Sequence, residues 1–502
     1  MTSAIPTTER WHSADPDPER ACVLALLQRY GWSATSFQIL EPGFQYWFDG
    51  DTPEDATGVV AYVDAPGHRV VAGPPVTDPD DLGETTRRFV EATRAEGRRA
   101  VFFAVEADFI AVLEGLDPPL AHDALPIAEQ PEWAPADYTL QGSKRRTLRA
   151  QVNRARNKGV RVRRIEPEEI ALAPGPLRAE IESVLSRWLA SRRMSVMRFM
   201  VDLEPFTFPE ARRYYVAEQG DRAVGFLAAI PVYRRKGWFF EDVIRVPEAP
   251  NGTAELLIHT AMADAAEHDD LYVTLGMAPL AGVPQDPGPH RMLRRTLGWC
   301  YQRLGLLYHF PGVRAFKARF HPDVWVQQYM VACPPKAGAR SIHAVLSAFA
   351  GGGLVAFGLD TARRLLARLS LAWWSWALYM LGVLLVPWTL VLALADGRRW
   401  FGDVSIQWAW VIFDAVMVFA LLGLGRLVRR RPGPARLLAV FLAGATWTDF
   451  VLTTVQAFHL HRAVSGWSLA FVLAGMSGPL LATLLLLVMA LVLPAPVLRH
   501  RP

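Results

Sequence analysis

Cysteine is scarce in this chain, and an export signal is absent from its start. The 502 residues contain three cysteines, Cys22, Cys300 and Cys333, which lie far apart and form no Cys-x-x-Cys pair. This spacing argues against a disulfide framework and a zinc ribbon, and it fits a reducing compartment. The polar start lacks a basic stretch followed by an apolar core, so we expect no secretory signal.

Long apolar runs are missing from the first 335 residues, although 51% of the whole chain is hydrophobic. In this part, charged residues are scattered among short apolar runs. The runs Gly58–Val63 and Ala100–Val105 indicate strands, and Leu82–Glu96 has a helical pattern. The length exceeds that of one ordinary core, so two or three folded units are expected. A net charge of +4 excludes an acidic solvating protein and permits an anionic partner.

The composition changes after residue 335, where apolar segments long enough to cross a bilayer begin. Two of the segments each contain one carboxylate, Asp414 and Asp449, and tryptophans cluster near the segment ends. A further segment, Ser341–Leu359, holds His343 and three glycines, so we expect an interfacial or re-entrant helix there. The four predicted spans are Leu371–Ala395, Trp408–Gly425, Leu437–Leu460 and Trp467–Leu493.

Arginines are unequally divided between the loops of this membrane part. The larger set contains Arg363, Arg364 and Arg368, the group from Arg426 to Arg436, and the arginines after the last span. By the positive-inside rule this set faces the cytoplasm. Because Ser341–Leu359 is not expected to span, the preceding domain is placed in the cytoplasm at the inner membrane.

The first 335 residues contain one stretch, Tyr138–Ile165, whose charged residues are all basic. No acidic residue occurs from Tyr138 to Ile165, and Leu148, Val152 and Ala155 repeat at helical spacing. We therefore predict a basic helix that ends at Gly159. A solvated helix face is one explanation, and a surface for the phosphates of RNA or of anionic lipids is the other. The candidates for phosphate contact are Lys144, Arg145, Arg149, Arg154 and Lys158.

Three later pieces combine polar residues with tight turns. In Phe239–Met262 a strand leads to Glu241, Asp242 and Arg245, and Pro250-Asn251-Gly252 then forms a turn before a helix. Strand alternation predicts that only one of Glu241 and Asp242 faces a site. Tyr272–Gly282 and Phe310–Pro322 are the other two pieces, and the last contains Arg314, Lys317 and Arg319.

Together these pieces resemble the catalytic domain of the phosphatidylglycerol lysyltransferase family, whose members are also called lysyl- or alanyl-phosphatidylglycerol synthases. The resemblance covers roughly residues 20–333. It rests on the run from Lys144 to Gly159, Asp242-x-x-Arg245 with Ala249-Pro250-Asn251-Gly252, Leu275-Gly276-Met277-Ala278-Pro279-Leu280, and Gly312-x-Arg314-x-Phe316-Lys317-x-Arg319-Phe320. Pro42–Phe48 and Val71–Val76 resemble the first half of the family domain.

The resemblance implies an α/β fold of tandem GNAT-like acyltransferase domains, here followed by an all-α transmembrane bundle. The expected organisation is a polar tail (1–19), a first GNAT-like domain (20–137), a basic helix with the second, catalytic domain (138–335), a linker (336–370) and the membrane domain (371–495). The resemblance also implies transfer of lysine or alanine from aminoacyl-tRNA to the hydroxyl of a phospholipid, without a cofactor. Acyl-CoA as donor, or a non-catalytic membrane-tethered protein that binds RNA or lipid, are the alternatives.

Roles for single residues follow from the same resemblance. Asp242 is expected to deprotonate the lipid hydroxyl or to hold the aminoacyl ammonium group, and an ion pair with Arg245 is the structural alternative. Lys317 and Arg314 are expected to grip the tRNA end or to stabilise the ester oxyanion. The remaining candidates for contact with lipid or aminoacyl group are Arg245, Asn251, Gly252 and Glu241. We expect no metal site.

The membrane part departs from the family, whose well-known bifunctional members carry a large membrane region before the catalytic domain. Here the helices follow that domain, so anchoring is expected and flipping is not carried over. For Asp414 and Asp449 we expect hydrogen bonds between helices, with a headgroup cavity or proton-linked lipid movement as the alternative.

Overall fold

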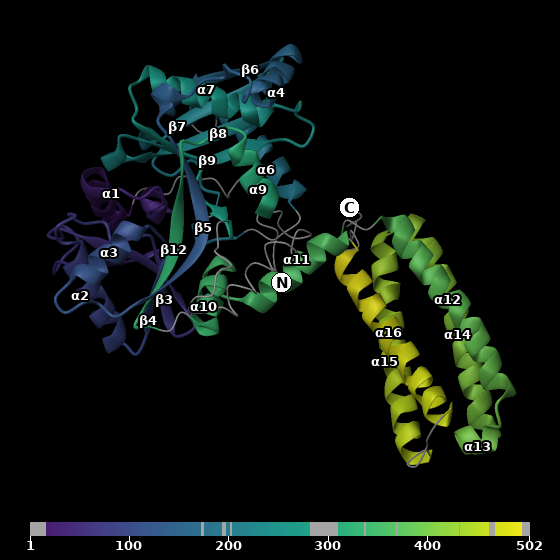
Figure 1. Ribbon diagram of the computed structural model, residues 1–502. Helices are drawn as coiled ribbons and strands as arrows, with labels where there is room; N and C mark the ends of the chain where they lie inside the picture. The colour runs from purple at the N-terminus through teal and green to yellow at the C-terminus, as the bar shows by residue number, and fades with distance from the viewer. Residues whose placement is uncertain are drawn as a thin grey trace, which may run out of the picture. The chain divides into compact units, whose positions relative to one another are not determined.

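The chain divides into two compact units, Met1–Phe357 and Gly358–Pro502, each described here by itself. The structure is a computed structural model (Figure 1). It describes residues 17–171, 175–192, 197–200, 203–281, 310–335, 338–367, 370–430, 432–460 and 467–493.

A mixed sheet of twelve strands forms the frame of the first unit within the described residues. Its order is β1-β2-β3-β4-β12-β5-β10-β9-β8-β7-β6, and β11 pairs with β5. The last strand, β12, thus lies between two strands from the early part of the chain, as Figure 1 shows for β12 and β5. The strands are β1 Gln45–Phe48, β2 Val59–Ala65, β3 His68–Ala72, β4 Arg99–Val105, β5 Asp123–Trp133, β6 Val160–Ile165, β7 Arg213–Gln219, β8 Arg222–Val232, β9 Gly237–Arg245, β10 Tyr272–Thr274, β11 Ala278–Pro279 and β12 Val324–Cys333.

Helices accompany this sheet, and the last of them, α11, crosses the boundary between the two units. They are α1 Pro18–Tyr30, α2 Leu82–Ala95, α3 Ala107–Gly115, α4 Arg146–Asn157, α5 Pro167–Ala171, α6 Pro176–Ser191, α7 Thr253–Glu267, α9 Phe310–Ala318, α10 Ala339–Phe349 and α11 Leu354–Ala367, with short 3₁₀ helices η1 Ser36–Leu40, η2 Pro135–Asp137, η3 Pro209–Ala211 and η4 Tyr233–Arg235.

The predicted basic helix is α4, and its apolar stripe fixes its position. Leu148, Val152 and Ala155 are buried in one core with residues of α7, while the basic side chains lie on the other faces. Burial of a leucine or valine side chain stabilises the fold by about 1.5–3 kcal/mol, so this narrow stripe suffices to dock the helix. Gly159 has φ +80° and separates α4 from β6, as its position in the sequence predicts.

The segment Ser341–Leu359 differs from the single interfacial or re-entrant helix expected from the sequence. It contains α10 and the start of α11, which are bent by 57°. Gly351 and Gly352 have positive φ values at the break, which few other residues adopt. Ala344 and Val345 of α10 are buried in the core formed with β2 and β3, so α10 is part of the first unit.

The second unit contains helices long and apolar enough to cross a membrane. Four of the described helices pass this test, and they confirm the four predicted spans. Two polar contacts join neighbours inside the bundle. The Ser375 hydroxyl donates to the Gly425 carbonyl (2.7 Å) between α12 and α14, and the Thr446 and Thr483 hydroxyls lie 2.8 Å apart between α15 and α16. The helices are α12 Leu371–Leu394, α13 Gly397–Phe401, α14 Val404–Arg430, α15 Pro432–Leu460 and α16 Trp467–Val492.

Candidate functional site

A buried group of carboxyl side chains lies where η1, β9 and the segment before β7 meet. Nη1 of Arg212 donates to Oε2 of Glu241 (2.9 Å), and Nε2 of Gln38 donates to Oε1 of the same carboxylate (2.7 Å). The side chains of Arg212 and Glu241 are 1% and 8% exposed. The Nε of Arg212 also donates to the Thr207 carbonyl (2.8 Å), which fixes the guanidinium.

Glu41 completes this group, which we name the carboxyl cluster: Gln38, Glu41, Arg212, Glu241 and Asp242. Burial, the adjacent Glu241 carboxylate and then Asp242 raise the pKa of Glu41 well above its ordinary 4.5, and the positive charge of Arg212 opposes them. Glu41 also shares a hydrogen bond with Glu241, which favours its protonated form. Three carboxyl groups therefore gather around one guanidinium, an arrangement that attracts a cation.

A β-bulge explains how two consecutive carboxylates join one cluster. Ala228 pairs with Asp242 and Ala229 pairs with Phe240, so Glu241 has no partner on β8. An extra residue of this kind bends the strand and redirects its side chains. The bulge interrupts the alternation expected from the sequence, and the prediction that one of the two carboxylates faces a site stays a prediction. Both raise the pKa of Glu41.

Lys317 lies in a cage of backbone carbonyls. Its Nζ donates to the carbonyl oxygens of Leu275, Gly276 and Met277 at 2.8, 2.8 and 2.7 Å. Burial lowers the pKa of Lys317 to about 7, whereas the three carbonyls favour the ammonium form, which has three N–H donors. The structure thus joins two of the predicted motifs, with Lys317 holding the loop after β10. Gly276 has φ +70°, and a Cβ there would meet the ring of Phe239 at 2.6 Å.

The other two basic candidates, Arg245 and Arg314, bind to groups of the chain itself. Nη1 of Arg245 donates to the carbonyls of Val246 and Ala249 (3.4 and 3.3 Å), so this side chain holds the turn before α7. The Nε of Arg314 donates to Glu129 (2.9 Å), and the guanidinium lies over the Trp325 ring. These contacts position both arginines.

The turn Asn251-Gly252 brings a third motif against α4. Asn251 is exposed, whereas Gly252 is buried with φ +98°. A Cβ at Gly252 would lie 2.0 Å from the carbonyl oxygen of Gln151, so only glycine permits this approach of α4. Helix α7 begins at Thr253, directly after the predicted turn, and the Thr253 hydroxyl donates to the Pro250 carbonyl (2.7 Å).

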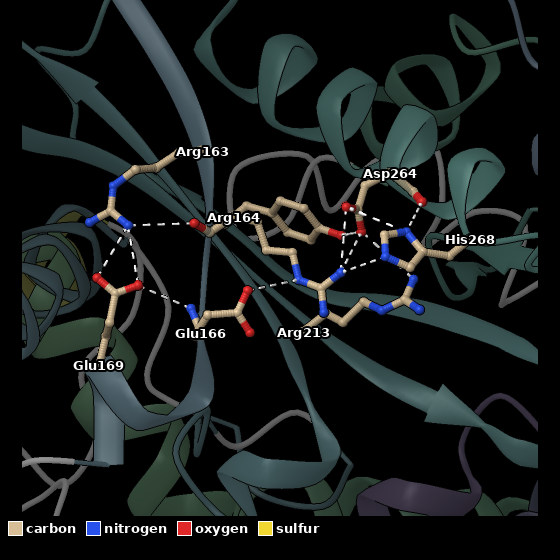
Figure 2. A network of polar contacts seen from close by, with 8 residues as sticks. Arg163, Arg164, Glu166, Glu169, Arg213, Asp264 and His268 are labelled. Atoms are coloured by element: carbon tan, nitrogen blue, oxygen red, sulfur yellow. Dashed lines mark hydrogen bonds and ion pairs between the residues drawn. The ribbon is translucent and has the colours of Figure 1, made fainter.

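The basic residues of the acid-free stretch differ in their partners. Arg163 pairs with Glu169 (3.3 Å) and Glu218 (3.4 Å), and Arg164 pairs with Asp264 (3.3 Å). Figure 2 shows most of this network, including the contacts of Asp264 with His268. Their charges are therefore largely neutralised.

On α4 itself the exposed cations have no such partners. Lys144, Arg154 and Lys158 are exposed and form no ion pair with any residue that the structure describes. Arg149 donates to the carbonyls of Leu140 and Gly142 (2.6 and 3.2 Å), and Arg145 is half-buried. Three of the five predicted phosphate-contacting residues are thus available on the surface.

Gln38, Glu41 and Arg212 escaped the sequence analysis because they are isolated polar residues in ordinary surroundings. Burial lowers the pKa of His259 to about 4, so this ring is uncharged at neutral pH. His309 lies outside the described residues. Across the residues that the structure describes, no group of three or more His, Cys, Asp or Glu side chains is arranged to hold a metal ion.

Comparison with known proteins places residues 24–332 on the sequence profile described as "Phosphatidylglycerol lysyltransferase, C-terminal". A phosphatidylglycerol lysyltransferase of Bacillus subtilis is 22% identical over 321 residues, which are 62% of this chain and 35% of that protein. An uncharacterized protein of Corynebacterium glutamicum is 24% identical over 325 residues, 62% of this chain and 38% of that one. The chain thus matches little more than a third of these relatives' length.

A solved structure supports the fold. The C-terminal domain of a lysylphosphatidylglycerol synthetase from Agrobacterium fabrum matches with a TM-score of 0.56 and 22% identity, over 67% of this chain and 98% of that one. The predicted α/β fold class, followed by helices long and apolar enough to span a membrane, is confirmed by this likeness together with the four apolar helices. The predicted boundary at residue 137 stays a prediction, since the sheet continues across it.

Proposed function

The chain belongs to the family of phosphatidylglycerol lysyltransferase C-terminal domains, and on this premise we propose that it transfers an amino acid, lysine or alanine, from aminoacyl-tRNA to the hydroxyl of a polar lipid such as phosphatidylglycerol. The observation that carries the proposal is the carboxyl cluster, which lies within the matched residues. An aminoacyl group carries an ammonium ion, and three carboxyl groups around one guanidinium attract it.

The reaction exchanges one ester for another. The lipid hydroxyl oxygen attacks the aminoacyl carbonyl carbon, a new C–O bond forms, and the C–O bond to the tRNA ribose breaks. In our assignment Asp242 takes the proton of the lipid hydroxyl and returns it to the departing ribose oxygen, while the Glu241 carboxylate attracts the ammonium group and the protonated Glu41 shares a hydrogen bond with Glu241. All atoms and charges balance without a cofactor.

Lys317 and Arg245 enter this scheme as positioning residues. Lys317 holds the loop Leu275–Met277, and that loop packs through Gly276 on Phe239, two residues before Glu241. Arg245 holds the turn that follows Asp242. Both therefore keep β9 and its bulge in place rather than touching the reacting ester.

The exposed cations of α4 support a tRNA donor. Phosphates of a nucleic acid attract arrays of unpaired arginine and lysine, and Arg154 and Lys158 are one helical turn apart on the same face. The alternative donor, acyl-CoA, would place its pyrophosphate at the helix start that follows β9. There α4 packs directly on Gly252, which makes this alternative the poorer one.

The membrane helices anchor the catalytic part at its lipid substrate. We assign the catalytic part to the cytoplasmic side of the inner membrane, because the larger arginine set lies on the same side as its connection to α12. Confinement to the membrane raises the effective concentration of the lipid, as linked binding events do in general.

The test uses membranes that contain the overproduced full chain. Total tRNA charged with radiolabelled amino acids is added, and the lipids are extracted and resolved by chromatography. We expect a labelled lipid that disappears after ribonuclease treatment and in Asp242→Asn. Asp221→Asn, an exposed turn residue, serves as the control variant. Absence of a labelled lipid with every amino acid would refute the proposal. Label supplied by acyl-CoA would support the alternative donor.

A further inference from the structure

The membrane unit contains a cavity of about 360 Å³ within its helix bundle. This volume falls in the range of about 300–1,000 Å³ that is usual for ligand pockets. Residues of α12, α13, α14, α15 and α16 all contribute to its lining. Figure 1 shows α12, α14, α15 and α16 running along one another in the second unit, with the short α13 at one end.

Two carboxylates face this cavity, although carboxylates inside a membrane span are costly and need a partner. Asp414 lies roughly 15 Å along α14 from its start, near the middle of the span. It is only 5% exposed, and its Oδ2 has no hydrogen-bond partner among the described residues. Asp449 of α15 accepts a hydrogen bond from the Thr453 hydroxyl (3.0 Å). This hydrogen bond lies within α15, whereas the sequence predicts hydrogen bonds between helices, and Oδ2 of Asp414 stays unsatisfied among the described residues.

The rest of the lining identifies the missing partner as a cation. Trp388, Trp400 and Trp410 line the cavity together with the two aspartates. Nε1 of Trp410 donates to Oε1 of Gln456 (3.1 Å), which fixes that ring. Indole faces attract organic cations, and the attraction is strongest where water is excluded. Among the lining residues that the structure describes, none is arginine, lysine or histidine.

We propose that this cavity binds the ammonium group of an aminoacylated lipid, with Asp414 and Asp449 as the anionic partners and the tryptophans as the aromatic wall. The assignment of an aminoacyl lipid rests on the proposed function, because that reaction produces an ammonium-bearing lipid in the same membrane. The site lies in a different unit from the carboxyl cluster. It is therefore a second lipid-binding site, and it retains or presents the product.

The test measures binding of ready-made lipids to the purified full chain in non-ionic detergent by native mass spectrometry. The probes are dioctanoyl lysyl-phosphatidylglycerol, dioctanoyl phosphatidylglycerol and dioctanoyl phosphatidylethanolamine. Because the lipids are supplied, the result does not depend on whether the chain transfers amino acids. Glu241→Gln is included to remove the contribution of the carboxyl cluster to ammonium binding without touching the cavity.

We expect lysyl-phosphatidylglycerol to bind at least tenfold more tightly than phosphatidylglycerol. Asp414→Asn/Asp449→Asn should lose this preference, because hydrogen bonds to charged groups are the stronger ones. The matched control Asp403→Asn, at an exposed residue preceding α14, should keep it. Gly475→Leu fills the cavity without a change of charge and should weaken binding as well. This second variant keeps the proposal testable if the double aspartate variant does not fold.

Equal affinity for lysyl-phosphatidylglycerol and phosphatidylglycerol in the unaltered chain would overturn the proposal. So would an unchanged preference in both Asp414→Asn/Asp449→Asn and Gly475→Leu. Binding of phosphatidylethanolamine as tight as that of lysyl-phosphatidylglycerol would overturn the assignment to aminoacyl lipids and give the site to amine-bearing lipids in general.

Discussion

Removal of two cations from the exposed face of α4 tests whether this surface binds tRNA. The variant is Arg154→Gln/Lys158→Gln. Glutamine is a good helix former, so α4 and its buried stripe are retained. Both side chains are exposed, one helical turn apart, and without an ion pair to any described residue. Their removal therefore changes the surface charge and leaves the core untouched.

The expected magnitude follows from counterion release. Each phosphate contact contributes about 0.7–0.9 to the slope of log K against log salt concentration. The loss of two contacts should lower the slope by about 1.4–1.8, which at 0.1 M salt weakens tRNA binding about 25- to 60-fold. Binding of fluorescently labelled tRNA to the full chain in detergent, measured from 50 to 300 mM salt, gives both quantities.

A charge-matched control comes from the same acid-free stretch. Arg163→Gln/Arg164→Gln also removes two positive charges, but these arginines pair with Glu169, Glu218 and Asp264 (Figure 2). We expect less than about a threefold loss of affinity and nearly the same slope in this variant. If both double variants weakened binding equally, net charge rather than the α4 surface would be responsible, and the reasoning would fail.

Three further predictions concern the carboxyl cluster and its supports. Because the folded state favours protonated Glu41, the contribution of Glu41 to stability should be fully present below pH 4.5 and should fall as the pH rises through the raised pKa. The variant Glu41→Gln should therefore melt at a higher temperature than the unaltered chain at pH 8. At pH 4 the two chains should melt at the same temperature. Lys317→Met leaves three carbonyls without donors and should cost about 3 kcal/mol or more in thermal unfolding, whereas a purely catalytic lysine could be replaced without that loss. Asp242→Asn should reduce transfer to lipid at least about a hundredfold with tRNA binding unchanged, and equal activity would remove Asp242 from the mechanism.

Periodicity and segment length predicted the parts of this fold that depend on local pattern. The stripe Leu148, Val152 and Ala155 predicted α4, because a helix needs one apolar face to dock. The four membrane helices were predicted because a span needs a run of about twenty apolar residues, whatever the rest of the chain does. The position of β12 between β4 and β5 has no local signal, since strand order is decided by pairing between distant segments.

The carboxyl cluster could not be predicted in full for the same reason. Gln38 and Glu241 are 203 residues apart in sequence, and Gln38 has no neighbour that marks it as functional. Glu241 was singled out only through the motif it shares with Asp242. The bulge that lets both carboxylates act on Glu41 arises from the mismatch between β8 and β9, and a strand pattern of period two gives no sign of it.

Three basic residues on and directly after α9, Arg314, Lys317 and Arg319, carry the same charge but make different contacts. Arg314 reaches Glu129 and the Trp325 ring, and Arg319 lies 3.6 Å from Glu255. Lys317 alone turns inward, because a compact ammonium with three donors matches three converging carbonyls, whereas a planar guanidinium does not. Through Gly276 and Phe239 its loop supports the strand that carries the bulge. Lys317 therefore links the last motif of the domain to the carboxyl cluster by packing, and its effect on transfer should follow its effect on stability.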